Sequence, residues 1–445
     1  MTVRPLPALG PVPQLESLEW TEQRLTSGLN VVAVRRPNVG MVEVRLQVPF
    51  QGAAPTHAAH AEVLAASLLA GTASRDRDEI AAQVQALGGA LHASVDADRL
   101  SVSGSALATE LPDLLEIIAD IVEAAAYPEE EVKRERDRLV ERLEIARSQP
   151  GVVAREALSA RLWGEHPYTH DMPQPGDVAL TEASDARQLH AERVRPGGAT
   201  LVIVGDVEAE RAIELCRHQL QLWTGEDATD GTGIEPLPTP SPGVPVLVDR
   251  PGSVQSSLRW AAPAVPREHP DSPALSLANL VFGGYFSSRW VENIREDKGY
   301  TYSPRSGIEH RALGSTFVAS ADVASEVTAP AVLETVYELG RIATAGVDDT
   351  EVENARQYAI GTLALSIATQ AGLASTLSAL AAVGVGPDYL RAQPRRLAEV
   401  TTEQVSAAAA RYLAPAGMVS VIVGDNAQVT GPLQLLTSLG DDRTH

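Results

Sequence analysis

The sequence predicts a mixed α+β fold made of two similar halves that a linker joins. Strand-like and helix-like patterns alternate along the chain, residues 224–245 are dense in Gly, Pro, Thr and Asp, and the pattern then restarts. Both halves also end on the same strand-like motif, Val202-Ile-Val-Gly-Asp206 and Val421-Ile-Val-Gly-Asp425. This period is far longer than that of a solenoid repeat, so it indicates two domains of similar fold that face each other across a cleft.

The first half, expected over residues 17–223, begins with two segments whose apolar and polar residues alternate as in paired strands, 25–34 and 41–48. A helix at 109–126 is expected because Leu111, Leu114, Ile118 and Val122 recur at helical spacing. The other helices of this half are expected at 58–70, 78–87, 128–147 and 151–162, and its other strands at 91–95, 99–105 and 201–206. The linker, expected over residues 224–245, has too few apolar residues to build a core.

The second half, expected over residues 246–432, repeats this alternation of strands and helices. Strands are expected at 246–248, 256–260, 315–323 and 419–425, and helices at 272–282, 329–343, 349–368, 373–382 and 402–412.

The composition limits the classes of partner and the compartment. The chain has 445 residues, 44% of them hydrophobic, and a formal net charge of -22 that would repel the phosphates of a nucleic acid. Cys216 is the single cysteine, which excludes an intrachain disulfide and a metal site built on several cysteines. Residues 1–16 do not read as a signal peptide, and no apolar run has membrane-spanning length. We therefore expect a cytoplasmic protein with neither a membrane nor a nucleic acid as partner.

One stretch combines polar and aromatic residues in a chain that is poor in aromatics. Gly283 and Gly284 predict a flexible turn, a helix is expected over 288–296, and Gly299 would end that helix. The next residues are expected to begin a strand. Arg295 would then lie in the last turn of the helix and Tyr302 just across a tight corner.

The motif that runs from Gly283 to Tyr302 is Gly-Gly-x-x-Ser-Ser-Arg-x-x-x-x-Ile-Arg-x-x-x-Gly-x-x-Tyr. It resembles the C-terminal-half signature of the insulinase/pitrilysin-type zinc peptidases, peptidase family M16. Other segments occur in the family's order and extend the resemblance over nearly the whole chain, among them Gly71-Thr72, Leu87-Gly-Gly89 and His166-Pro-Tyr168. The resemblance implies two insulinase-type α/β rolls in a clamshell arrangement. It also implies that Arg295 and Tyr302 hold the backbone of a substrate peptide opposite a zinc ion.

The metal motif of the family is degenerate in this chain. Active members carry His-x-x-Glu-His just before the Gly-Thr pair, because histidines four apart share one helix face and the Glu can deprotonate the attacking water. Aligned on Gly71-Thr72, the two histidines fall on Glu62 and Ala66 and the base on Ala65. The later Glu ligand falls near Glu141 and Arg142. No metal is therefore expected in this chain.

The resemblance thus implies a non-catalytic, substrate-binding subunit of a heterodimeric zinc metallopeptidase. A homologous partner with an intact His-x-x-Glu-His would supply the zinc, and peptides would be cleaved inside a closed chamber. One alternative is an autonomous peptidase with a shifted metal site at His57, His60 and Glu62, although these histidines are three residues apart. A second alternative is a scaffold or binding protein without a proteolytic role, like the family members in respiratory complexes. Motifs for a serine nucleophile, a phosphate loop or a dinucleotide are absent from the sequence.

Overall fold

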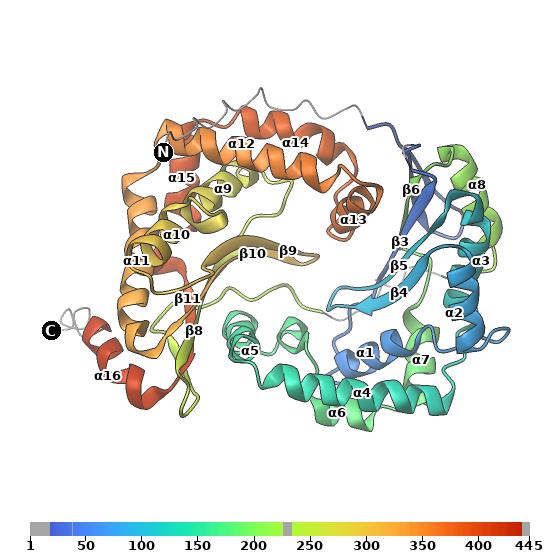
Figure 1. Cartoon of the computed structure of the whole chain (residues 1–445), viewed down its shortest axis with the longest axis horizontal. Coiled ribbons are helices and arrows are strands. Elements are labelled where there is room, and N and C mark those ends of the chain that lie inside the picture. Colours follow the sequence, from blue (N-terminus) through green and yellow to red (C-terminus); the bar gives the residue numbers. More distant parts are fainter. Residues whose placement is uncertain (1–17, 38, 226–233, 438–445) are drawn as a thin grey trace, which may run out of the picture.

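The computed structural model describes residues 18–37, 39–225 and 234–437 as two domains, each a sheet covered by helices (Figure 1). The first half runs from blue to green in Figure 1 and the second from yellow to red. Residues 1–16, read above as lacking a signal peptide, and residues 226–233 of the expected linker lie outside the described residues. The described part of that linker, 234–245, contains neither helix nor strand. The bounds expected for the halves stay a prediction.

The sheet of the first half has six strands in the order β1-β2-β6-β3-β5-β4. The strands are β1 (Thr21–Arg24), β2 (Asn30–Arg35), β3 (Met41–Pro49), β4 (Ala90–Val95), β5 (Arg99–Leu107) and β6 (Thr200–Gly205). The expectation that the strands at 25–34 and 41–48 pair with each other was wrong, because β6 lies between them, parallel to β2 and antiparallel to β3. Alternation indicates which face of a strand is buried but not which strand lies beside it.

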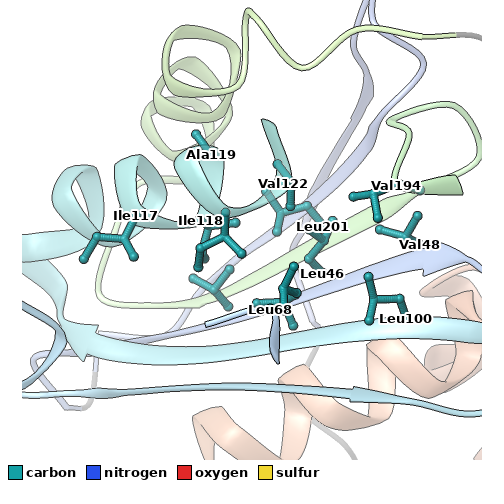
Figure 2. Close-up of a cluster of buried hydrophobic side chains, with 14 of the residues drawn as sticks. Leu46, Val48, Leu68, Leu100, Ile117, Ile118, Ala119, Val122, Val194 and Leu201 are labelled. Atoms are coloured by element: carbon teal, nitrogen blue, oxygen red, sulfur yellow. The ribbon is translucent and has the colours of Figure 1, made fainter. Parts of the chain in front are cut away.

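Helices cover the sheet of the first half, and α3 packs directly onto it. The helical segments are α1 (His57–Ser67), α2 (Arg77–Ala86), η1 (Ala108–Glu110), α3 (Leu111–Ala124), α4 (Glu129–Arg147), α5 (Pro150–Trp163), η2 (Pro167–His170), α6 (Pro175–Leu180), α7 (Ala183–Arg193) and α8 (Ala209–Gln219). Figure 2 shows Ile118 and Val122 of α3 over Leu46, Leu100 and Leu201 of the strands, all of them buried. The apolar stripe predicted for this helix is therefore its contact with the sheet.

The sheet of the second half has the order β7-β11-β8-β10-β9. Its strands are β7 (Val246–Asp249), β8 (Gln255–Ala264), β9 (Arg305–Arg311), β10 (Gly314–Ala324) and β11 (Val419–Gly424). This order repeats β2-β6-β3-β5-β4, and the last strand again lies parallel to the first and antiparallel to the second. The shared topology confirms that the two halves have a similar fold.

The helical segments of the second half are α9 (Ser272–Asn279), η3 (Leu280–Gly284), α10 (Arg289–Val291), η4 (Glu292–Asp297), η5 (Ser325–Val327), α11 (Thr328–Ala345), α12 (Asp349–Ser366), α13 (Gln370–Ala381), α14 (Asp388–Ala398), α15 (Thr402–Tyr412), η6 (Pro415–Gly417) and α16 (Asn426–Thr437). Over the described residues, no single helix has both the length and the apolar character to cross a membrane. The helices α12 and α13 meet those criteria only as a pair, and they are bent by 111° at their junction.

One helix of each half packs on the sheet of the other half. The helix α13 packs on β3 and β6, where Leu373 and Leu377 meet Val202 and Val32. In return, α5 packs on β8 and β11, where Leu158 meets Val421. Successive residues of β6 point to opposite faces of the sheet, and they belong to two different hydrophobic clusters. The contacts with the other half therefore use the sheet faces that each half's own apolar helices leave free. Neither sheet is therefore covered on both faces by its own half alone.

A polar contact between the halves accompanies this exchange. Asp98, at the β4–β5 turn, accepts hydrogen bonds from the Tyr168 hydroxyl and, at 3.1 Å, from the backbone N–H of Ala312 in the β9–β10 turn. The Tyr168 hydroxyl in turn accepts the N–H of Leu313 at 3.2 Å. Arg311 pairs with Asp171 at 2.9 Å and stacks over the Tyr168 ring at 4.8 Å. The β9–β10 hairpin is thus fastened to the first half.

The helix exchange predicts a large cost for truncating Leu373. Leu373→Ala removes a fully buried side chain between the halves, and we expect a loss of about 2–5 kcal/mol in the free energy of unfolding. Leu365→Ala is the matched control because Leu365, on the adjoining α12, is 75% exposed, and we expect a change within about 0.5 kcal/mol. Urea unfolding followed by circular dichroism measures both, and equal losses would contradict the packing described here.

Candidate functional site

The corner that carries Arg295 and Tyr302 is built by backbone hydrogen bonds. The helix that begins at Arg289 continues as the π-helical η4, and Gly299 follows it with a positive φ of 65°. The N–H of Gly299 donates to the carbonyl of Arg295 at 3.2 Å, and the N–H of Tyr300 donates to that of Ile294 at 2.9 Å. Gly299 ends the helix as predicted, because its left-handed conformation suits a residue without a Cβ.

The strand expected to begin at Tyr300 begins instead at Arg305, as β9. Within the corner, Thr301 alone bridges to Val323 of β10, and its hydroxyl donates to the carbonyl of Asp322 at 2.7 Å. Thr301 therefore anchors the chain to the sheet immediately before Tyr302.

The Gly283–Gly284 pair is a packing requirement and not the flexible turn expected from the sequence. Both residues lie in the π-helical η3, which continues α9. A Cβ on Gly283 would lie 2.9 Å from the Trp290 ring, and one on Gly284 would lie 2.7 Å from the amide nitrogen of Asn279. Trp290 is itself buried and stacks on Phe282 with ring centroids 5.3 Å apart. Because glycine has no Cβ, this segment can pack closely against the aromatic core.

Arg289, which the sequence did not single out as a structural residue, anchors the motif to α12. Its Nε and Nη2 each donate to a carboxylate oxygen of Glu351 at 2.6 Å, and Nη2 also donates to the carbonyl of Gly346 at 3.0 Å. Such a bidentate pair fixes the orientation of both side chains. The helix that presents Arg295 is thus held rigidly against the second half.

Arg295 and Tyr302 themselves are not tied into the core. The Tyr302 side chain is 88% exposed, which is unusual for a large aromatic residue. The guanidinium of Arg295 stacks over the ring of Phe286, itself 59% exposed, at 4.3 Å. Its Nε lies 3.3 Å from the carboxylate of the neighbouring Glu296. The phenol of Tyr302 is therefore presented to solvent on a rigid support, and the planar cation of Arg295, whose side chain is 30% exposed, is partly open to solvent.

The positions of the degenerate metal motif lie on two helices of the first half that pack together, α1 and α4. Glu62, Ala65 and Ala66 are on α1, and Arg142 is on α4. Burial raises the pKa of Glu62 to about 7, and the nearby positive charge of Arg142 opposes that shift. The alanines offer no ligating atom, so these residues do not fit a zinc ion. Among the described residues, no group of three His, Cys, Asp or Glu side chains could hold a metal.

The shifted metal site at His57 and His60 also fits poorly. The Nε2 of His57 lies 2.6 Å from the carbonyl oxygen of Phe50 and donates to it. Gly52 packs against Nδ1 so closely that a Cβ there would lie 2.3 Å away. Burial lowers the pKa of His57. Both ring nitrogens therefore have protein neighbours, and neither faces a cluster of ligands.

Comparisons with known proteins show the family of the chain. Residues 60–176 match the family model for insulinase (peptidase family M16), and residues 182–358 match the model for the peptidase M16 inactive domain. The chain belongs to peptidase family M16. An uncharacterized zinc protease of Mycobacterium tuberculosis is a relative of this M16 protein, 24% identical over 98% of this chain and 100% of its own length.

Solved structures have the same M16 fold. A peptidase M16 inactive domain from Pseudomonas fluorescens superposes with a TM-score of 0.85 at 24% identity, over 92% of this chain and 98% of its own. A protease from Helicobacter pylori gives a TM-score of 0.84 at 17% identity, over 92% and 99% of the two chains. The mitochondrial cytochrome b-c1 complex subunit 1 of Bos taurus is also similar, 22% identical over 48% of this chain and 45% of its own.

A cavity of about 500 Å³ lies between the two halves of this M16 protein. Its first-half wall includes Glu62, Asp96 and residues of α5, and its second-half wall is the face of β8, β9 and β10. Arg155, Arg259, Arg305 and Arg311 all line it. The sequence did not indicate these arginines, because they come from separate segments. The one available signal was Arg259, the single charged residue of the strand β8.

The raised pKa of Glu62 predicts a pH-dependent cost to stability. The folded pKa of about 7 lies above the unfolded value of 4.5, so the folded state binds the proton more tightly. Stability therefore falls as pH rises from about 4.5 to 7 and then levels off. Glu62→Gln removes this loss, so its advantage over wild type should grow across that interval by up to about 3 kcal/mol.

Urea unfolding at several pH values measures this difference. Glu141→Gln is the control, since Glu141 is exposed on α4 and its replacement should give no comparable trend. A difference between Glu62→Gln and wild type that does not change with pH would show that Glu62 is ionised normally in the folded protein.

Proposed function

We propose that this chain is the non-catalytic, substrate-binding subunit of a heterodimeric zinc metallopeptidase. A homologous partner would carry the intact His-x-x-Glu-His and its zinc, and the two chains would enclose a peptide between them. The observation that carries the proposal is a rigid corner on which Tyr302 is exposed and Arg295 is half-buried. The absence of ligating atoms at positions 65 and 66 supports a division of labour, since this chain would have to obtain its metal chemistry from another.

The chemistry of the corner suits a peptide backbone. A guanidinium offers several N–H donors and no acceptor, and a phenol adds one O–H donor, so together they can hold peptide carbonyls. The stack on Phe286 limits the freedom of the Arg295 head group before substrate arrives, which lowers the entropic cost of binding. The role of this pair would be to orient the scissile bond toward the partner's zinc and not to transfer a proton.

A scaffold without a proteolytic role remains the second candidate. The similarity to cytochrome b-c1 complex subunit 1 favours it, because that relative is named as a subunit of a larger complex and not as a protease. A scaffold, however, would not need a half-buried Arg and an exposed Tyr on a rigid corner. The two candidates differ in one outcome, which is whether this chain changes peptide hydrolysis when a partner is added.

Reconstitution tests the proposal. The chain should be mixed with an M16 homologue from the same organism that carries His-x-x-Glu-His, and a peptide library assayed with zinc present. We expect hydrolysis only from the mixture. Arg295→Ala and Tyr302→Phe should each lower kcat/KM by about tenfold or more, because each removes a donor that positions the substrate.

The matched controls are Arg395→Ala and Tyr337→Phe, which change exposed residues of α14 and α11. Both should leave activity and complex formation unchanged. Full hydrolysis by the homologue alone, or a mixture that stays inactive although the two chains associate, would count against the peptidase role.

A further inference from the structure

We propose that Arg155, Arg259 and Arg305 form a binding site for a carboxylate or phosphate group in the cavity between the halves. None of the three belongs to the corner of Arg295 and Tyr302, so the inference goes beyond the peptide-holding role and does not rest on it.

The register of the second sheet places two of these arginines in one row. Arg305 of β9 lies opposite Ser320 of β10, and Ser320 lies opposite Arg259 of β8. Directly opposite residues in antiparallel strands point to the same face of a sheet, and all three line the cavity. The row therefore crosses three strands, with a guanidinium at each end and a hydroxyl at its centre.

The third arginine reaches the row from the helix that the first half lends to this sheet. The helix α5 packs on β8, and its Gly151 lies so close that a Cβ there would be 3.2 Å from Nη2 of Arg259. Arg155 is one turn further along α5 and lines the same cavity. The site thus exists only because the two halves exchange helices.

The positive charges of the site are incompletely balanced within the protein. Arg259 is only 8% exposed, and its ion pair is with Asp322 at 3.2 Å, a side chain that is 55% exposed. Burial lowers the pKa of Arg259, Asp322 opposes that shift, and the like charges of Arg305 and Arg155 add to it. Within the described part of the chain, neither the Arg155 nor the Arg305 side chain makes a hydrogen bond or an ion pair.

This imbalance is notable in a chain with a net charge of -22, since carboxylates are plentiful. Three carboxylates of the cavity are paired with other arginines: Glu156 with Arg147 at 2.8 Å, Asp171 with Arg311 at 2.9 Å, and Asp96 with Arg99 at 3.2 Å. Burial raises the pKa of a fourth, Glu62, to about 7. Glu309 lies four residues from Arg305 along β9, roughly 13 Å away.

The natural complement of such a cluster is an oxyanion, because guanidinium groups bind carboxylate and phosphate in a bidentate manner. The cavity of about 500 Å³ has room for more than a single ion, as ligand sites measure about 300–1,000 Å³. Two sources of the anion are compatible with it: an acidic side chain of a bound peptide, and a free phosphate.

Calorimetric titration of the full chain at constant ionic strength tests the site. The probes are inorganic phosphate and two blocked peptides that differ only by one central Glu or Gln. We expect the Glu peptide to bind about tenfold tighter than the Gln peptide, since one bond between ionised groups is gained. The double variant R155Q/R305Q should abolish that preference, whereas R211Q/R395Q, which removes two exposed arginines elsewhere, should retain it.

Phosphate binding without peptide preference, lost in R155Q/R305Q, would support the site with a free anion as its ligand. Equal binding of both peptides together with no phosphate binding would overturn it, and so would anion binding that R155Q/R305Q leaves unchanged. Arg155 and Arg305 are both exposed, so the double variant should fold, and its thermal unfolding profile verifies this. The test is separate from that of Arg295 and Tyr302, because it measures binding without a partner or zinc.

Discussion

The exchange of helices between the two halves is the contact on which the rest of the molecule depends. A sheet with two apolar faces must cover both, and each half has enough apolar helix for one. The second face of the first sheet is covered by α13, and that of the second sheet by α5. This arrangement fixes how the halves face each other. It also sets the walls of the cavity and the position of the β9–β10 hairpin beside Asp98.

Much of the element order could be predicted from local pattern. The helix at Leu111 and the one at Glu129 were placed within a few residues, since their apolar stripes or charge patterns are long. The neighbours of β2 and β3 could not be predicted in this way, because β6, the strand that separates them, comes more than 150 residues later in the chain. The helices α6, α7, α14 and α16 were not predicted; α6 and α7, for example, have only a few buried residues each.

The residues of the candidate sites likewise fall into those that a local motif could indicate and those that it could not. Arg295, Gly299 and Tyr302 lie within eight residues of one another, so a local motif could indicate their corner. The row of Arg305, Ser320 and Arg259 depends on register across three strands, and Arg155 depends on the packing of a helix from the other half. No local pattern in a single sequence contains that information. The degenerate metal positions, in turn, came from resemblance and not from physical reasoning about the residues.

In both sheets the strand made last occupies an interior place, β6 between β2 and β3, and β11 between β7 and β8. A growing polypeptide that leaves the ribosome from its N-terminus therefore cannot finish either sheet until the end of that half has been translated. A premature stop codon ahead of Val419 would delete an inner strand and leave β7 without its neighbour. Nascent chains of this protein would then expose unpaired strand edges for most of their synthesis. A chaperone that covers such edges would be most needed during that time.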